Sequence, residues 1–220
     1  MAVSGAITEA ITEAIYSLND LSDRFNLRQT DSDRFFSEWQ EDLPELNEQE
    51  KIGIARLKQR YDYQRMDGLL LEGTIQVAVV SPLLELVGFL DAPYRMHSPY
   101  GITLELDDSE EILRGFIDML VIQKKLWILV IESKRTSISV LAAIPQLLAY
   151  MLASPNGRSD KPSYGLATNG DEFVFLKMTH DETPKYDVSR TFSLFPRQHE
   201  LGQVIQILKR LGLAVQETLY

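Results

Sequence analysis

Cysteine is absent from this chain of 220 residues, which excludes a disulfide scaffold, a thiolate zinc site and a cysteine nucleophile. Histidine is scarce, since only His97, His180 and His199 occur, and their spacing fits no metal site. No apolar run reaches the ~18 residues that a membrane-spanning helix needs, so no membrane partner is expected. The first 18 residues carry two Glu and no basic residue, unlike a signal peptide. A cytoplasmic location is therefore expected.

Positive charge is also in short supply, because 22 Lys and Arg face 32 Asp and Glu, a formal net charge of −10. Proteins that coat nucleic acid gain their affinity mainly by neutralising phosphates, so this balance argues against that class. An enzyme that touches DNA locally with a few basic side chains remains compatible with it.

The length fits one domain with a helical extension. Residues 1–66 are polar-rich, and Ile7, Ile11, Ile15 and Leu18 have the spacing of one helix face. A second helix is expected over 32–42, before Pro44, and a third from the N-cap Asn47 towards residue 66. The predicted organisation is a helical N-terminal extension at 1–66 and a second unit at 67–220.

The second unit alternates helical and strand patterns. Helices are expected over 69–81, 140–153 and 200–211, the last followed by Gly212. Strands are expected over 94–96, 102–106, 164–168 and 172–177, and the β-branched runs 115–122 and 126–134 form a hairpin around a Gln-Lys-Lys turn. This order predicts an α/β fold with a mixed central sheet flanked by helices.

Candidate chemistry lies in the predicted hairpin. Strand side chains alternate, so Ile128, Val130, Glu132 and Lys134 share a face. A turn centred near Lys124 places Asp118 opposite a residue close to Val130. Asp118, Glu132 and Lys134 are therefore expected to converge at one end of the sheet.

Two adjacent carboxylates repel unless a cation or a shared proton lies between them. Mg²⁺ suits such a pair, because it takes one or two carboxylates, keeps several waters and binds substrate phosphate. Lys134 would then face the ion and the attacking water, which favours metal-assisted hydrolysis of a phosphodiester. A structural explanation stays open, since an acidic residue and a lysine two positions apart usually mark a solvent-exposed strand edge.

The spacing from Asp118 to Glu132-Ser133-Lys134 resembles the core motif of the PD-(D/E)XK nucleases. More narrowly, it is similar to the N-terminal nuclease domain of type I restriction enzyme R subunits, and the likeness covers residues 69–177. The fold that it implies is restriction-endonuclease-like. Four further segments carry it: Glu72-x-Thr74 with the following Pro82-to-Gly88 helix, Gly115-to-Asp118, Gln146 with Tyr150, and Thr168-Asn169-Gly170.

The resemblance implies a Mg²⁺-dependent endodeoxyribonuclease, with Mn²⁺ as a substitute ion. Its partners would be DNA and other restriction-modification subunits. The implied roles are metal ligation by Asp118, Glu132, the Ser133 carbonyl and Glu72 in an outer or second position, and catalysis by Lys134, supported by Gln146 and Tyr150.

Two departures from the family pattern qualify this implication. Ile117 stands where many members have Pro, and the chain contains no G-x-x-x-x-G-K-[ST] loop, so the ATP-driven motor of a full R subunit is missing.

Alternatives remain. The chain could be a non-catalytic DNA-binding or assembly module that retains the nuclease fold, with the Phe35-Phe36-Trp39 face of the N-terminal helices as a homodimer or partner surface. It could also be a phosphodiesterase acting on RNA or a nucleotide. For Gln146, Tyr150 and Glu72 the structural alternatives are a surface glutamine, a core-edge tyrosine and a structurally paired charge.

Overall fold

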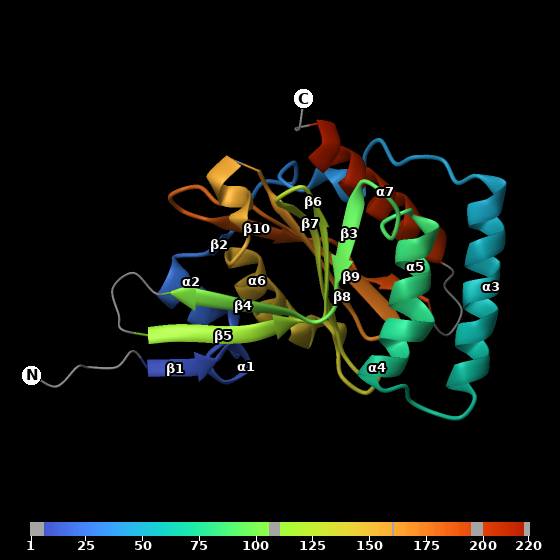
Figure 1. Cartoon of the computed structure of the whole chain (residues 1–220), viewed down its shortest axis with the longest axis horizontal. Helices are drawn as coiled ribbons and strands as arrows, with labels where there is room; N and C mark the ends of the chain where they lie inside the picture. The colour runs from blue at the N-terminus through green and yellow to red at the C-terminus, as the bar shows by residue number, and fades with distance from the viewer. Residues whose placement is uncertain (1–6, 106–110, 160, 195–199, 218–220) are drawn as a thin grey trace, which may run out of the picture.

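The computed structural model describes residues 7–105, 111–159, 161–194 and 200–217. Its strands form two sheets (Figure 1). The smaller has the order β1-β5-β4, and the larger has the order β2-β10-β9-β8-β7-β6-β3, with β11 paired to β9. The strand bounds are β1 Ile7–Ala10, β2 Arg28–Gln29, β3 Tyr94–His97, β4 Tyr100–Glu105, β5 Glu111–Ile117, β6 Met119–Gln123, β7 Leu126–Ser133, β8 Ser163–Thr168, β9 Glu172–Met178, β10 Lys185–Val188 and β11 Phe192–Ser193.

Helices pack on both faces of the larger sheet. Their bounds are α1 Ile11–Ala14, α2 Leu18–Phe25, η1 Ser37–Trp39, α3 Glu48–Arg65, α4 Glu72–Ile75, the π-helix η2 Gln76–Val80, α5 Ser81–Leu86, η3 Val140–Ala143, α6 Ile144–Leu152, η4 Pro155–Ser159 and α7 Leu201–Glu217. Strand pairing is mixed, because β7 runs parallel to β8 while β6 with β7, and β8 with β9, are antiparallel. The predicted α/β class with a mixed sheet flanked by helices is confirmed.

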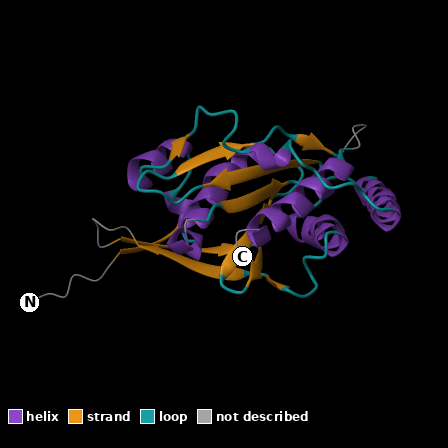
Figure 2. Ribbon diagram, turned by 90° about the horizontal axis from the view of Figure 1, so that it is seen from above, coloured by secondary structure: helices purple, strands orange, loops and turns teal. Residues whose placement is uncertain are grey.

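The two faces of the larger sheet carry separate hydrophobic clusters. On one face the sheet packs against α3, α5 and α7, which lie together on the right of Figure 1. On the other face lie α1, α2, α6 and the inner side of the smaller sheet. Figure 2 shows the smaller sheet extending from the body towards the N-terminus. Alternation along β8 divides its residues, since Leu166 packs on the first face and Ala167 on the second.

The helix predicted with Ile7, Ile11, Ile15 and Leu18 on one face is wrong at both ends. Residues 7–10 form a strand, the helix is interrupted after Ala14, and Leu18 starts a separate helix and is exposed. Ile7–Ala10 is strand β1, paired in parallel with Glu111–Arg114 of β5, and the helix starts only at Ile11. Ile11 and Ile15 still face the core, as their spacing predicted. Short helices are marginal alone, so pairing with β5 decides the conformation of this segment.

The helix predicted over 32–42 is also wrong, because only the short 3₁₀ turn η1 forms there. Phe36 is fully buried, and Phe35 and Trp39 pack against the first cluster. Glu38 fixes the segment by accepting hydrogen bonds from Tyr164 and from Lys177. The aromatic face proposed for a homodimer or partner is therefore occupied by the protein's own core.

Residues 7–66 contain the predicted helix α3, which starts at the capping box of Asn47 and Glu50. They also supply β1 to the smaller sheet and β2 to the larger one. Leu57 and Tyr61 of α3 lie in the first cluster. The described part of this segment is thus built into both sheets and the core, and a domain boundary at residue 66 stays a prediction.

Most of the other predicted elements are present, but the strand predicted over 115–122 is divided at Asp118, with 115–117 ending β5 of the smaller sheet and 119–122 lying in β6 of the larger one. The helix expected over 69–81 begins at Glu72 and continues through η2 and α5 to Leu86. The closing helix α7 runs past Gly212, where the prediction ended it, to Glu217. Gly212 lets the helix lie against Phe89, whose ring is 2.8 Å from the place a Cβ would occupy. Residue 106, expected to end a strand, lies outside the described residues. No helix in the described part of the chain is both long and apolar enough to cross a membrane.

Candidate active site

A β-bulge in the hairpin brings Asp118 and Glu132 together. Lys124 and Lys125 form the turn, and Lys124 adopts a positive φ of 57°. The pairing then shifts between Val121 and Ile122, so Met119 lies opposite Ile131. A turn of Lys124 and Lys125 alone would put Asp118 opposite Ile131, and the one extra residue on β7 moves its partner to Glu132.

The side chains of β7 pack in a way that agrees with this shift. Ile128 and Leu129 are consecutive, yet both pack in the first cluster, whereas Val130 packs in the second. Ile128 consequently does not share a face with Val130, contrary to the prediction. Glu132 follows Val130 onto the face covered by α6.

Asp118 is held by the residue that follows Glu132. The Ser133 backbone N–H and hydroxyl donate to Asp118 Oδ2 at 2.7 and 2.6 Å. Ser133 is fully buried, and its Oγ also accepts a hydrogen bond from the Gln76 side chain of η2 at 2.9 Å. In this arrangement Ser133 fixes the Asp118 carboxylate through its N–H and hydroxyl.

Lys134 joins the carboxylate to helix α6. Its ammonium group pairs with Glu132 Oε1 and donates to Gln146 Oε1 at 3.0 Å. The Gln146 amide in turn donates to the Tyr150 hydroxyl, one helical turn further on. Glu132, Lys134, Gln146 and Tyr150 therefore form one connected polar chain. Spacing in the sequence predicted the two pairs, and the bond between Lys134 and Gln146 joins them.

The electrostatics of Glu132 are unfavourable in the absence of a ligand. Glu132 is only 2% exposed, and one of its carboxylate oxygens, Oε2, is buried with no hydrogen-bond partner. Burial and, second, the charge of Asp118 raise the pKa of Glu132 to about 8, although Lys134 opposes the shift. Burial and then the charge of Glu132 also raise the pKa of Tyr150, so its hydroxyl stays protonated.

Glu72 lies at the start of α4, at the edge of the site. It is exposed, and its charge makes a smaller contribution to the raised pKa of Glu132. It lines the same pocket as Asp118 and Glu132. The structure therefore places Glu72 near the pair, at its solvent side.

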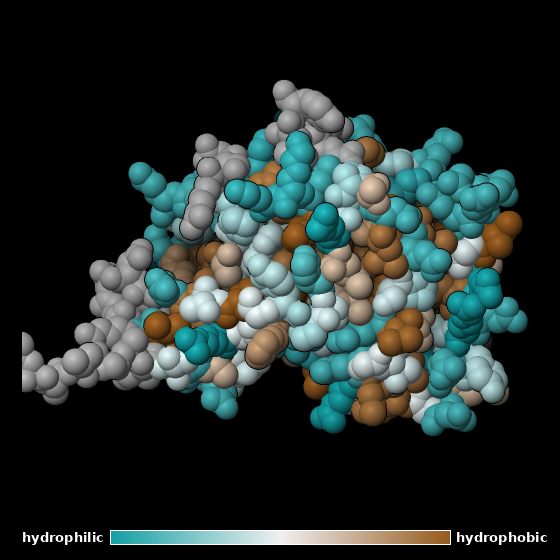
Figure 3. Space-filling view, in the orientation of Figure 1, coloured by the Kyte–Doolittle hydropathy of each residue, from teal (hydrophilic) through white to brown (hydrophobic). Residues whose placement is uncertain are grey.

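These side chains open into a pocket of about 510 Å³ between the smaller sheet and α4. A notch is visible at this place on the lower side of the space-filling view (Figure 3). Sequence analysis gave no site role to the residues that β1, α1 and β5 contribute to the wall, although Gly115 and Phe116 belong to a segment that carries the resemblance. These wall residues are Thr8, Glu9, Ala10, Thr12, Arg114, Gly115 and Phe116. The signal available was weak: Arg114 and Phe116 precede Asp118 at alternate positions, whereas the β1 segment resembled a helix.

The pocket contains four carboxylates, of Glu9, Glu72, Asp118 and Glu132, but only two cationic groups, of Arg114 and Lys134. Within the described ranges no group of three or more His, Asp or Glu side chains is arranged to hold a metal ion. The residues still fit a hard divalent cation held by two carboxylates and waters. This fit is supported by the buried oxygen of Glu132, which has no hydrogen-bond partner and lies beside a second carboxylate.

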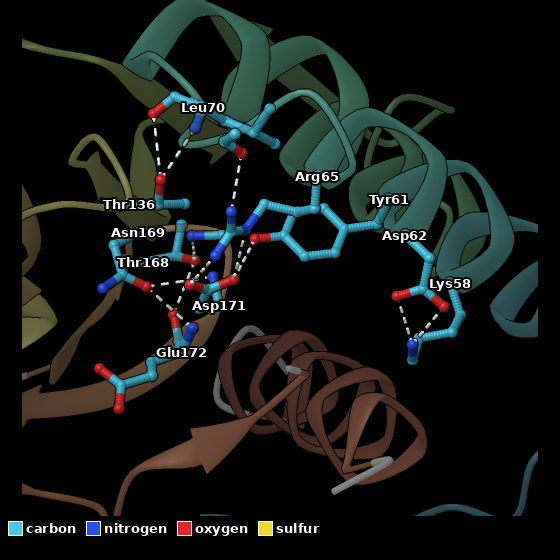
Figure 4. A network of polar contacts seen from close by, with 12 residues as sticks. Lys58, Tyr61, Asp62, Arg65, Leu70, Thr136, Thr168, Asn169, Asp171 and Glu172 are labelled. Atoms are coloured by element: carbon cyan, nitrogen blue, oxygen red, sulfur yellow. Dashed lines mark hydrogen bonds and ion pairs between the residues drawn. The ribbon is translucent and has the colours of Figure 1, made fainter. Parts of the chain in front are cut away.

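A second polar network lies next to the site, at the Thr168-Asn169-Gly170 turn (Figure 4). The Lys134 backbone N–H donates to the Thr168 carbonyl at 2.8 Å, so the turn supports the end of β7. Asp171 accepts from the Tyr61 hydroxyl at 2.5 Å and from two nitrogens of Arg65 at 3.2 Å. This network fastens α3 to the turn.

Comparison with known proteins adds little. No protein-family model matches the chain, and no curated protein matches it. Among solved structures it is similar to the fragment structure of a putative HsdR subunit of a type I restriction enzyme from Vibrio vulnificus YJ016, with 17% identity and a TM-score of 0.40. The match covers 66% of this chain and 26% of that one. Function therefore has to be argued from the site.

Proposed function

We propose that this protein is a Mg²⁺-dependent nuclease of the PD-(D/E)XK kind that hydrolyses DNA phosphodiester bonds. The observation that carries the proposal is the meeting of Asp118, Glu132 and Lys134 in one pocket, with a buried carboxylate oxygen that lacks a partner. Oε2 of Glu38 is also buried without a partner, so what distinguishes Glu132 is the second carboxylate, that of Asp118, beside its orphaned oxygen in a pocket.

Each residue has a role in this mechanism. A divalent cation, when bound, supplies positive charge to the phosphate oxygens and a more acidic water. Asp118, fixed by Ser133, and Glu132, through its free oxygen, would hold the cation. The Ser133 carbonyl and Glu72 remain candidates for further ligation.

Lys134 supplies the positive charge that the protein itself contributes next to the two carboxylates. Its ammonium group is fixed between Glu132 and Gln146, so little reorganisation is needed when negative charge develops on the phosphate. Gln146 is a positioning residue, because its carbonyl holds Lys134 while its amide is held by Tyr150.

The test is cleavage of supercoiled plasmid DNA with Mg²⁺, Mn²⁺ or EDTA, comparing the wild type with Asp118→Ala and Lys134→Ala. We expect cleavage that needs the cation and is lost in both variants. Asp62→Ala and Lys51→Ala, on α3 and outside the pocket, serve as controls that retain cleavage. Activity that survives in both site variants would remove these residues from the mechanism.

A non-catalytic binding or assembly module is the second candidate. It is favoured by the net charge of −10 and by the excess of carboxylates in the pocket, both of which oppose tight binding to DNA without a cation. Calorimetry separates the two: specific Mn²⁺ binding that Glu132→Ala abolishes supports the nuclease. A phosphodiesterase acting on RNA shares the site and is separated by a parallel assay on RNA.

A further inference from the structure

Phe116 is an exposed aromatic residue at the wall of the candidate active site. It is 69% exposed, although it lies in strand β5, and it lines the same pocket as Asp118. Arg114 and Phe116 are both exposed on one face of β5, and both line the pocket together with Asp118, which follows the strand in a bend. Single exposed rings are common on protein surfaces, and what distinguishes Phe116 is its place in the pocket that holds Asp118 and Arg114.

Neighbouring glycines fix where this ring lies. Phe116 is paired with Gly101 of β4, and a Cβ on Gly101 would lie 3.5 Å from the ring, so one part of the ring covers bare backbone. At Gly115 a Cβ would come within 2.9 Å of the Tyr150 ring, so the glycine lets β5 lie against Tyr150. Phe116 is therefore attached directly to the wall that Tyr150 supports, and most of its ring stays open.

Arg114 supplies the only cation of the pocket besides Lys134. It is exposed, and it makes no ion pair within the described part of the chain. Its place on the same side of β5 as Phe116 sets a positive charge beside an aromatic ring. Proteins that bind single-stranded nucleic acid combine these two features, because the cation contacts the backbone while the ring stacks on a base.

We infer that Arg114 and Phe116 position the DNA strand, with Phe116 stacking on an unpaired base beside the scissile phosphate and Arg114 contacting a neighbouring phosphate. The inference rests on the proposed nuclease function and adds a substrate class to it. A base can reach an exposed ring only when it leaves the duplex stack. The protein therefore acts on single-stranded or locally opened DNA in preference to a continuous duplex.

Binding is measured without cleavage, by fluorescence anisotropy of a fluorescein-labelled 12-nucleotide strand and of its duplex, with Ca²⁺ in place of Mg²⁺. The wild type is expected to bind the single strand more tightly than the duplex. Phe116→Leu, which still covers Gly101 but has no ring face, is expected to weaken binding of the single strand about tenfold. Phe116→Trp, which keeps a ring that can stack, is expected to bind the single strand as tightly as the wild type.

Matched controls isolate the two contacts. Tyr63→Ala removes an aromatic residue of similar exposure, 71%, from α3 and leaves binding unchanged. Arg114→Ala should make the slope of log K against log salt concentration shallower by about 0.7, the value for one lost phosphate contact to a single strand. Arg60→Ala, on α3, should leave this slope unchanged.

The outcomes separate this inference from the proposed function. If binding of the single strand depends on Phe116 but the protein cuts no DNA with Mg²⁺, the inference is supported and the proposed nuclease function is excluded. If the wild type cuts DNA but Phe116→Leu binds the single strand as tightly as the wild type, the nuclease function is supported and the inference is overturned. It is equally overturned if the wild type prefers duplex or binds neither oligonucleotide.

Discussion

The two polar networks at the ends of β7 and β8 differ in how well their carboxylates are satisfied. In one, the single carboxylate of Asp171 accepts hydrogen bonds from Tyr61 and from two nitrogens of Arg65. In the other, the carboxylates of Asp118 and Glu132 lie together with one lysine, and an oxygen of Glu132 has no partner. The first network is complete without a ligand and holds the fold, whereas the second is incomplete without one.

Removing charge from the incomplete network should affect chemistry rather than folding. We expect Lys134→Ala to lower plasmid cleavage by about 10²- to 10³-fold, the loss typical for a fixed group that stabilises developing charge. Rates of cleavage at saturating Mg²⁺ and thermal unfolding are measured on the same samples. A fall in cleavage that is matched by loss of folded protein would contradict the comparison.

The complete network should respond in the opposite way. Asp171→Ala leaves the partly buried Arg65 and the buried hydroxyl of Tyr61 without their acceptor, so the free energy of unfolding should fall by about 3 kcal/mol. Urea denaturation measures it. Asp62→Ala, which breaks a more exposed pair with Lys58 on the same helix, should cost less than about 1 kcal/mol. Equal losses in the two variants would argue against a special role for Asp171.

Neutralising Glu132 should stabilise the protein when metal is chelated. Its pKa is raised from 4.5 to about 8, so its unfavourable effect is absent below pH 4.5 and grows as the pH rises towards 8. In EDTA, Glu132→Gln should therefore exceed the wild type in stability by roughly 2 kcal/mol at pH 8, and by much less at pH 5.

The control for this change is Glu50→Gln, which alters a buried carboxylate that pairs with Lys209 and caps α3 through Asn47. That variant should lose stability at both pH values. A loss of stability in Glu132→Gln across the whole pH range would mean that its carboxylate is as well satisfied as that of Glu50.

The smallest effect is expected at the end of the polar chain. Tyr150→Phe keeps the buried ring but removes the hydroxyl that accepts from Gln146, a contribution of about 1 kcal/mol. Cleavage should fall about fivefold through a lower kcat, while Tyr186→Phe, also buried on this face of the sheet, leaves kcat unchanged. Loss of thermal stability without any change of kcat would limit Tyr150 to a structural role.

Local patterns were enough to predict the parts of the site that lie close in sequence. The β-branched runs and the Gln-Lys-Lys turn predicted the hairpin, and the four-residue spacing of Gln146 and Tyr150 predicted their shared helix face. The exact partner of Asp118 could not be predicted, because the bulge at Ile128 and Leu129 depends on how both side chains pack against one face of the sheet.

Long-range contacts explain the remaining errors. Whether residues 7–10 form a strand is decided by β5, about a hundred residues away, and this strand brings Glu9 into the pocket. The aromatic residues at 35–39 looked like a helix face, yet they fill the core from an irregular segment because Glu38 is bound by Tyr164 and Lys177. Neither partner can be recognised from the local sequence.

The most direct test of the account is the anomalous density of a crystal soaked with Mn²⁺. We predict one strong peak between Asp118 and Glu132, about 2.1 Å from an oxygen of each carboxylate, and no peak in crystals of Glu132→Ala. Strong density elsewhere, or none at this place with both carboxylates ordered, would contradict the claim that this pocket holds a metal ion.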